Sequence, residues 1–509
     1  MNILGISAGF HDAAATVINH DGDILFAGHS ERYSKQKNDA HLNPLLLAEI
    51  EKYNINKIAY YERPWLKQLR RLRSGETIQW NRLTVEQCLR QELGNTEPHY
   101  QNPAILDDVF MTLNLRPKIY SYDHHKSHAA AGFQTSPYDR ATVVVIDAIG
   151  EFDTITIWGA DYDIRGRAHY KKLWGQKYPH SIGLFYSAMT KRVGLKPLDE
   201  EYILMGMAAY GDNKFENLMK HNLIENEWDM TFKQNLHIGV DDDFINSDDT
   251  MSIARSAQAL VENLIYNVMR RAKDFGWSNN LVYMGGVALN CSANRNLGDY
   301  FDNIWIMPNP GDAGSSLGCA ALAYGKKLNW TDAYLGTEIP GPYPCNDILD
   351  ALRTDRIVGV ASGRAEFGPR ALGNRSLLAD PRGPDIKDAV NEIKRRQKFR
   401  PFAPVILEEL VDEYFEMPKG FDTSPYMQTV ARCKQPDLYP AIVHGDGTSR
   451  VQTVPKDGSG IRELLEKWYV MTGCPMLLNT SLNIRGEPMV NDRKDADRFE
   501  QMYGVKVCS

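Results

Sequence analysis

The chain has 509 residues, of which 43% are hydrophobic and 24% are charged, and its formal net charge is -7 at pH 7. This composition predicts a globular protein of several domains and excludes one that binds nucleic acid through a strongly basic overall charge. The seven cysteines are dispersed without Cys-x-x-Cys spacing, and neither a leader-like start nor an apolar run of about 18 residues occurs. We therefore expect a cytoplasmic protein with no disulfide framework and no membrane partner.

The first predicted elements are three strands between Ile3 and Ala27, joined by a glycine-containing turn and by a hairpin at Asp21-Gly22. The turn holds Gly9 and His11, and its small residues would let backbone N-H groups approach a phosphate closely. A plain hairpin explains the same stretch equally well.

Residues 63–73 have the pattern of an amphipathic helix, with leucines on one side and Lys67, Arg70 and Arg71 on the other. A solvated basic face is the ordinary interpretation of this pattern. The alternative is a docking face on which Arg70 and Arg71 bind the phosphate of a substrate.

The stretch 122–132 contains His124 and His128, which project from one face if the alanine-rich segment is helical. Asp147 closes a run of β-branched residues, and Asp312 follows a strand-like stretch and a turn. Two imidazoles and two carboxylates at strand ends suit a divalent metal that polarises a phosphate or carbonyl oxygen. The alternatives are surface histidines and, for Asp312, a helix cap.

The stretch 141–160 repeats the strand-turn-strand pattern of the opening residues, which predicts a duplicated α/β architecture around a nucleotide or acyl-phosphate cleft. A buried strand at 281–284 then runs into Gly285 and Gly286. Paired glycines at this position would admit an adenosine or ribose against the backbone.

A proline- and glycine-rich stretch at 336–344 indicates a domain boundary. The residues beyond it combine guanidinium, ammonium, amide and hydroxyl groups with glycine turns, which suits two phosphorylated ligands. These candidates are Arg364, Arg370, Arg375, Lys398, Arg400, Arg450, Asn479, Ser481, Asn483 and Arg485. Salt-bridged surface arginines remain the alternative for any one of them.

Several ordered motifs make the chain resemble the NodU/CmcH/TobZ family of ATP-dependent O-carbamoyltransferases along nearly its whole length. The matching stretches are 9–13, 123–129, 205–211, 285–291, 311–314, 366–376, 399–404 and 478–483. The chain departs from the family at Ile203, where relatives have lysine, and at Ala209, where they have proline.

The resemblance implies an N-terminal actin-like (ASKHA) domain at 1–335 and a C-terminal YrdC-like α/β domain at 345–509. It implies that His11 is catalytic and that His124, His128, Asp147 and Asp312 bind iron or another divalent transition metal. The carbamoyl-adenylate would lie in the N-terminal domain against Lys37, Gly285, Gly286 and Asn290.

In the implied reaction, the C-terminal domain makes carbamoyl-adenylate from ATP and carbamoyl phosphate, with Mg²⁺ assisting. The carbamoyl group would then pass to a hydroxyl of a sugar, an antibiotic-like molecule or a nucleotide. A threonylcarbamoyl-transfer enzyme acting on tRNA and an actin-like sugar kinase are the rival functions. The oligomeric state stays open, with a homodimer among the options.

Overall fold

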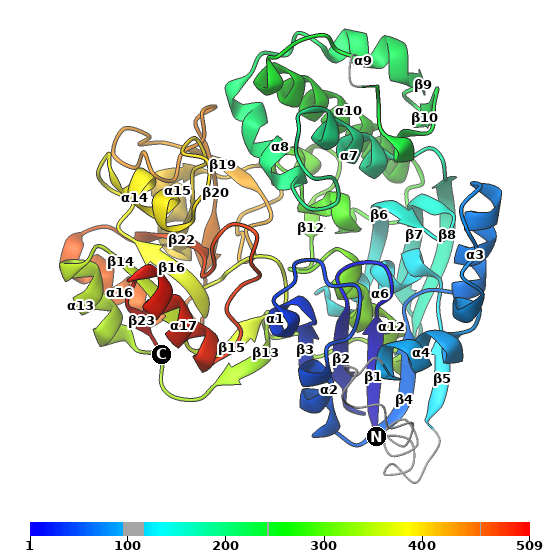
Figure 1. Cartoon of the computed structure of the whole chain (residues 1–509), viewed down its shortest axis with the longest axis horizontal. Helices are drawn as coiled ribbons and strands as arrows, with labels where there is room; N and C mark the ends of the chain where they lie inside the picture. The colour runs from blue at the N-terminus through cyan, green and yellow to red at the C-terminus, as the bar shows by residue number, and fades with distance from the viewer. Residues whose placement is uncertain (95–116, 242–243, 459) are drawn as a thin grey trace. The chain divides into compact units, whose positions relative to one another are not determined.

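The computed structural model describes residues 1–94, 117–241, 244–458 and 460–509. Contacts within the chain divide it into two units (Figure 1). The first unit comprises Met1–Ser34, Asn38–Leu289 and Tyr300–Thr331, and the second comprises Lys35–Lys37, Asn290–Asp299 and Asp332–Ser509. Two short segments thus belong to the second unit although the first unit flanks them in the sequence.

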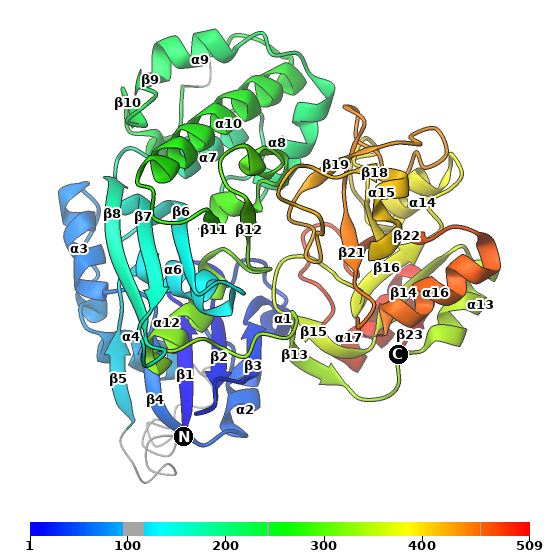
Figure 2. The ribbon, with the colours of Figure 1, turned by 180° about the vertical axis from the view of Figure 1, so that it is seen from behind.

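The first unit contains two five-stranded sheets with one topology. In the order β3-β2-β1-β4-β5, the first sheet consists of Ile24–His29, Ala14–Ile18, Asn2–Ser7, Ile55–Tyr60 and Lys118–Ser121. In the order β8-β7-β6-β11-β12, the second consists of Ala168–Lys177, Asp153–Tyr162, Arg140–Gly150, Asn280–Met284 and Asn303–Trp305 (Figure 2). In each sheet, three consecutive strands pair antiparallel and two later strands add in parallel beside the first of them.

Two helices built largely from small residues pack between these sheets. Helix α6 (His124–Thr135) lies on β6 and β11, and α12 (Ser315–Tyr324) lies on β1, β2 and β4. The helices cross so closely that a Cβ added at Gly318 would lie 1.8 Å from the carbonyl oxygen of Ser127. This close approach brings the first turn of α6 near the residues that precede α12.

The remaining helices of the first unit surround these layers, and α10 packs against α7, α8 and α9. They are α1 (Glu31–Ser34), α2 (Pro44–Glu51), α3 (Pro64–Arg73), η1 (Trp80–Arg82), α4 (Val85–Gly94), α7 (Ile182–Arg192), α8 (Glu201–Met207), η2 (Ala208–Tyr210), α9 (Glu216–Leu223), η3 (Leu236–Ile238), α10 (Thr250–Asp274), η4 (Gly286–Leu289) and η6 (Asp312–Gly314). A hairpin of β9 (Ile224–Asn226) and β10 (Thr231–Phe232) follows α9.

The second unit is built on a six-stranded mixed sheet. In the order β21-β17-β22-β16-β14-β23 it consists of Gln452–Val454, Ala403–Leu407, Met476–Ser481, Arg375–Ala379, Ile357–Ala361 and Val507–Cys508. Smaller sheets are formed by β13 (Tyr334–Ile339) with β15 (Gly363–Glu366), and by β18 (Phe415–Glu416), β19 (Val430–Cys433) and β20 (Thr448–Arg450). The helices are α11 (Cys291–Asn294), η5 (Leu297–Asp299), α13 (Cys345–Thr354), α14 (Ile386–Ile393), η7 (Glu408–Leu410), α15 (Val411–Tyr414), α16 (Ile461–Thr472) and α17 (Arg493–Tyr503).

The expected strands of the opening stretch and the expected helix at His124 are confirmed. The prediction that Asp147 closes a strand is wrong, because β6 continues to Gly150. The pairing of β6 with β7 instead shifts register between Ile146 and Gly150, so Asp147 lies at an irregularity that re-aims its side chain. Among the described residues, no helix is long and apolar enough to cross a membrane.

Candidate functional site

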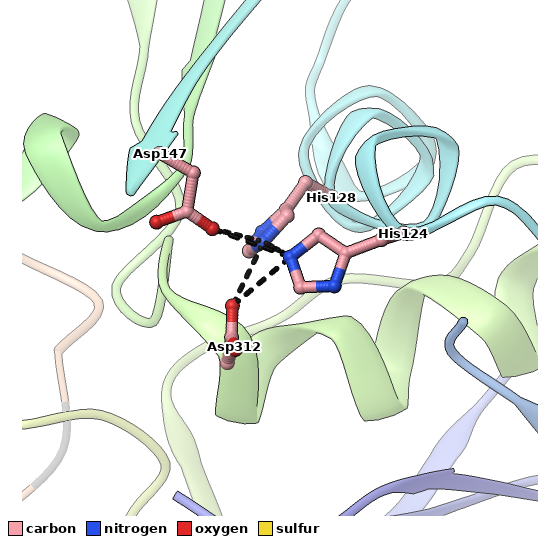
Figure 3. A group of neighbouring side chains, drawn as sticks. All are labelled: His124, His128, Asp147 and Asp312. Carbon is pink, nitrogen blue, oxygen red and sulfur yellow. Dashed lines mark hydrogen bonds and ion pairs between the residues drawn. The ribbon is translucent and has the colours of Figure 1, made fainter. Parts of the chain in front are cut away.

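Four buried side chains from three elements of the first unit meet at one point (Figure 3). Helix α6 supplies His124 and His128, the irregular part of β6 supplies Asp147, and η6 supplies Asp312. One ligand atom from each residue lies within 4.8 Å of the other three. The structure therefore brings together the four residues that the sequence singled out as metal ligands.

The distances within this cluster fit a bound cation. Nε2 of His128 lies 3.1 Å from Asp147 Oδ2 and 3.2 Å from Asp312 Oδ1, and Nε2 of His124 lies 3.3 and 3.2 Å from the same two oxygens. Metal bonds of about 2.1 Å place neighbouring ligand atoms about 3.0 to 3.4 Å apart in octahedral or tetrahedral geometry. Two imidazoles with two carboxylates are a donor set suited to zinc, iron and related divalent ions.

The electrostatics of the cluster also indicate a place for positive charge. Burial lowers the pKa of each imidazole, yet the nearby carboxylates raise the pKa of both His124 and His128 above the ordinary value. The same histidines hold the pKa values of Asp147 and Asp312 below the ordinary range, although burial opposes this. Both carboxylates are thus kept ionised although they are buried, and two buried negative charges strongly favour a cation beside them.

The backbone around Asp147 fixes which of its oxygens faces the histidines. Its Oδ1 accepts hydrogen bonds from the amides of Ala148 at 2.8 Å and Gly286 at 3.3 Å, which leaves Oδ2 for the cluster. Gly285 has a φ of 91°, and a Cβ there would lie 2.1 Å from the carbonyl oxygen of Ile146. The glycine pair therefore positions Asp147, and its expected contact with a nucleotide stays a prediction.

Glu151 is a residue of this site that the sequence did not single out. Its carboxylate accepts hydrogen bonds from the backbone amides of His124 and Arg63, so it caps α6 from the β6-β7 turn. Burial raises the pKa of Glu151 to about 7. A lone glutamate after a glycine carries no sequence signal for capping a helix that begins 27 residues earlier.

His11, the expected catalytic histidine, lies beside the cluster. Its Nε2 is 3.6 Å from Asp312 Oδ2, and its Nδ1 is 2.9 Å from Asp12 Oδ2. Burial lowers its pKa, but Asp312 and Asp12 raise the pKa to about 9. Asp312 therefore faces the two helix histidines with one oxygen and His11 with the other.

The basic side of α3 differs from the expected free docking face. Arg70 is buried and pairs with Glu76, which also lies 3.5 Å from Arg71. The guanidinium of Arg70 further stacks on the ring of Tyr178. Arg70 is thus engaged within the unit, whereas Arg71 shares the single negative charge of Glu76 with it, and the expected docking of a substrate phosphate stays a prediction.

Arg375 in the second unit differs from its expected role as a phosphate ligand. Its side chain is completely buried. Its guanidinium donates hydrogen bonds to the carbonyl oxygens of Thr337, Ser362, Gly363, Asn374 and Asn491. Glu366 holds the same loop by accepting from the amides of Leu372, Asn374 and Arg375. Arg375 therefore joins backbone segments, and its buried guanidinium is occupied by carbonyl oxygens. Its expected contact with a phosphate stays a prediction.

Lys394, which follows α14, is a further residue that the sequence did not single out. Its ammonium group donates hydrogen bonds to Asn483 Oδ1 at 2.7 Å and to the hydroxyl and carbonyl oxygens of Ser481 at 3.0 and 2.5 Å. Burial and the neighbouring cations Arg396, Arg400 and Lys37 lower the pKa of Lys394 well below the ordinary value. The acceptors on Lys394 in the described part of the chain are neutral oxygens, and a buried ammonium group near other cations suits a polyanionic ligand.

Arg450 adds a half-buried cation with a buried nitrogen. Its Nε is buried without a hydrogen-bond partner, and burial lowers its pKa. Burial also lowers the pKa of nearby His444 to about 4, with Arg450 and Lys387 contributing. A buried guanidinium nitrogen with an open hydrogen-bonding position is the donor that a phosphate oxygen would satisfy.

The other expected ligands of the second unit have varied surroundings. Arg364 donates to the carbonyl oxygens of Leu335 and Gly336, and buried Asn479 donates to Gln452 Oε1 and the carbonyl oxygen of Ala371. Lys398 is exposed and lies 3.6 Å from Glu392. Arg370 is half-buried and Arg485 is exposed. Their expected contacts with ATP and carbamoyl phosphate stay predictions.

Two residues expected in the N-terminal domain belong to the second unit. Lys37 lies in the segment 35–37, whose Lys35 pairs with Asp495. Asn290 begins the segment 290–299 and caps α11 by accepting from the amide of Ala293. This exchange could not be predicted, because each segment is too short to show a change of composition.

Comparison with known proteins gives matches over most of the chain. The family model described as Carbamoyltransferase N-terminus matches residues 2–321, and the one described as Carbamoyltransferase C-terminus matches residues 349–508. An uncharacterized protein of Synechocystis sp. is 33% identical over 98% of this chain and 94% of its own. Nodulation protein NolNO of Sinorhizobium fredii is 29% identical over 96% of this chain and 76% of its own. The 3'-hydroxymethylcephem-O-carbamoyltransferase of Amycolatopsis lactamdurans is 28% identical, over 76% of this chain and 79% of its own.

Proposed function

The chain belongs to the carbamoyltransferase family and is an enzyme that transfers a carbamoyl group to a hydroxyl acceptor, and from this premise we propose how its two units divide the reaction. The second unit makes carbamoyl-adenylate from ATP and carbamoyl phosphate, and the first unit transfers the carbamoyl group. A tRNA substrate is not favoured, because both family models are those of carbamoyltransferases. The repeated sheet topology of the first unit supports an actin-like fold. For the second unit we propose a YrdC-like fold, which rests on the resemblance of the sequence alone.

The cation cluster of the second unit supports the activation step. Phosphate groups would compensate buried Lys394 and half-buried Arg450, whose Nε is buried, and Ser481 and Asn483 hold the ammonium group in place. Water first hydrolyses carbamoyl phosphate to carbamate and orthophosphate. An oxygen of the carbamate then attacks the α-phosphorus of ATP. Pyrophosphate leaves as this bond forms, and Mg²⁺ bound to ATP neutralises the negative charge that develops on the pyrophosphate. The products are thus carbamoyl-adenylate, orthophosphate and pyrophosphate.

The buried His/Asp cluster is the single observation that best supports transfer in the first unit. His124, His128, Asp147 and Asp312 would hold a divalent transition metal such as Fe²⁺, which supplies Lewis-acid polarisation of the carbamoyl oxygen when bound. A cation held by Asp312 would offset the pull of this carboxylate on the pKa of His11, so that the ring could be neutral. Asp12 accepts from Nδ1 of His11 and would then fix the tautomer in which Nε2 takes the proton of the acceptor hydroxyl. The acceptor oxygen then attacks the carbamoyl carbon, and AMP leaves.

Two measurements separate the proposed steps. The activation step is measured by carbamoyl-phosphate-dependent exchange of labelled pyrophosphate into ATP. The transfer step is measured by mass spectrometry, which detects labelled carbamoyl groups on molecules of a metabolite pool. We expect His11→Gln to abolish labelled product while exchange continues. Exchange without carbamoyl phosphate, or product formation by His11→Gln at the parent rate, would contradict the proposal.

A further inference from the structure

A groove of about 480 Å³ opens on the first unit, and none of the four residues of the metal cluster lines it. Its walls are residues 63–65 at the start of α3 and residues 83–85 at the start of α4, and Ser121 at the end of β5 completes the lining. This volume lies in the range of roughly 300 to 1,000 Å³ that is usual for sites of small molecules. The indole of Trp65 is 54% exposed, so a flat apolar surface is available to a ligand.

The α3 wall of the groove is attached to the first turn of the metal-binding helix. The amide of Arg63 donates to Glu151, the same carboxylate that accepts from the amide of His124. The guanidinium of Arg63 also lies 3.1 Å from Asp123, which immediately precedes that histidine. The start of α3 and the start of α6 are therefore held by two shared carboxylates.

Residues next to both walls contact the turn that carries His11. Lys67, one helical turn after Arg63, lies 5.0 Å from the ring centre of Phe10, whose ring packs 4.6 Å from that of His11. On the other wall, Arg82 precedes the lining residues and packs on Gly9, where an added Cβ would lie 1.7 Å from its Nη2. The groove thus adjoins both the base and the metal helix of the proposed transfer site.

The charges around the groove argue against a phosphorylated ligand. Among the lining residues that the structure describes, Arg63 is the only charged one, and Asp123 compensates it. Lys67 is likewise paired with Glu62 at 3.0 Å. A phosphate would need an uncompensated cation or a cluster of donors, whereas tryptophan, leucine and valine side chains favour the faces of a neutral ring.

We propose that this groove binds the carbamoyl acceptor, and that the acceptor is an uncharged, ring-containing polyhydroxyl molecule of the glycoside type that stacks on Trp65. The inference rests on the proposed function, because it places the second substrate of that reaction. A hydroxyl of the stacked ring would project from the groove toward His11, while the rest of the molecule covers the apolar walls.

Binding can be tested without turnover, using phenyl β-D-glucopyranoside and its 6-phosphate as probes in saturation-transfer NMR with the full chain. We expect the neutral probe to bind the parent protein more tightly than its phosphate. Trp65→Ala should weaken binding of the neutral probe about fivefold, because one aromatic stacking contact is lost, and Trp65→Phe should restore most of it. Trp228→Ala, which removes a 40% exposed tryptophan elsewhere in the unit, is the matched control and should change nothing.

Three outcomes overturn the proposal: no binding of the neutral probe to the parent at millimolar concentration, equal binding by Trp65→Ala and the parent, or tighter binding of the phosphorylated probe. Circular dichroism of each variant shows whether it is folded before binding is compared. Pyrophosphate exchange by the parent tests the proposed function separately. Failed exchange with Trp65-dependent binding would reject the activation step and retain the groove as a glycoside site.

Discussion

Nε2 of His128 lies 3.1 Å from Nε2 of His124, and the two nitrogens face the same carboxylate oxygens. The Nδ1 atoms of both rings are buried without hydrogen-bond partners. The two Nε2 atoms cannot both carry a proton that points at the other nitrogen. Both can, however, direct a lone pair at one cation between them. The cluster is therefore better explained as a metal site than as a hydrogen-bonded network.

Removing one of these histidines should remove the metal. We expect His128→Ala to lower metal affinity by at least about tenfold and to reduce transfer correspondingly, because a quarter of the donor set is lost. Metal content by elemental analysis after dialysis against a weak chelator is the measurement. His125→Gln is the control, because His125 is buried on the same helix but its Nδ1 faces Thr156. Equal metal content in His128→Ala and the parent would exclude the metal assignment.

Two helical glycines give a matched test of how the fold assembles this site. At Gly318 an added Cβ would lie 1.8 Å from the backbone oxygen of Ser127, whereas at Gly206 nothing lies within 4 Å. We expect Gly318→Ala to destabilise the protein by about 1 to 3 kcal/mol through overpacking, and Gly206→Ala to be neutral or stabilising by up to about 1 kcal/mol. Thermal melts of the two variants measure this, and similar melting temperatures would contradict the close helix crossing.

The residues of the metal cluster could be predicted because each carries a local signal. The spacing of His124 and His128 places them on one helix face, and Asp147 and Asp312 each follow a strand-like run. The continuation of β6 beyond Asp147 could not be predicted, because the register shift depends on pairing with β7. Likewise, the capping of α6 by Glu151 is a tertiary contact without a sequence pattern.

The roles of the basic residues were harder to predict, since arginines in glycine-rich stretches look alike. Arg375 and Arg450 have similar surroundings in the sequence, yet one donates to five carbonyl oxygens and the other keeps a buried nitrogen without a partner. Lys394 resembles an ordinary lysine at a helix end, which the helix dipole alone would explain. Burial, which the sequence does not show, separates these roles.

Arg375 and Arg450 should respond differently to the same substitution. We expect Arg375→Ala to destabilise the second unit by about 3 kcal/mol or more, because it leaves several buried carbonyl oxygens without donors. Arg450→Ala should instead retain or gain stability and weaken ATP or carbamoyl phosphate binding at least about tenfold. Chemical denaturation and calorimetric titration of both variants decide between the roles. Arg375→Ala with parent stability and lost ATP binding would restore the phosphate contact that the sequence predicted.

Lys394 should make stability and ligand binding depend on pH. Its pKa is lower in the folded chain than in the unfolded one, so the unfolded chain binds more protons between the two pKa values. Stability should therefore rise with pH toward about 10.5, the usual lysine value, as the cost of the buried ammonium group disappears. Lys394→Met should flatten this rise, whereas Lys467→Met, which removes an exposed lysine paired with Glu463, should leave it unchanged.

The same argument predicts that ATP binding is accompanied by proton uptake at Lys394. Phosphate groups beside the ammonium group would raise its pKa, so a proton should be taken up on binding at a pH between the pKa values of the free and the ligand-bound protein. Calorimetry in buffers of different ionisation enthalpy measures the number of protons directly. We expect this uptake in the parent and in Lys467→Met, and its loss in Lys394→Met together with weaker binding. Proton uptake of equal size in Lys394→Met would assign the uptake to another group and contradict this role of Lys394.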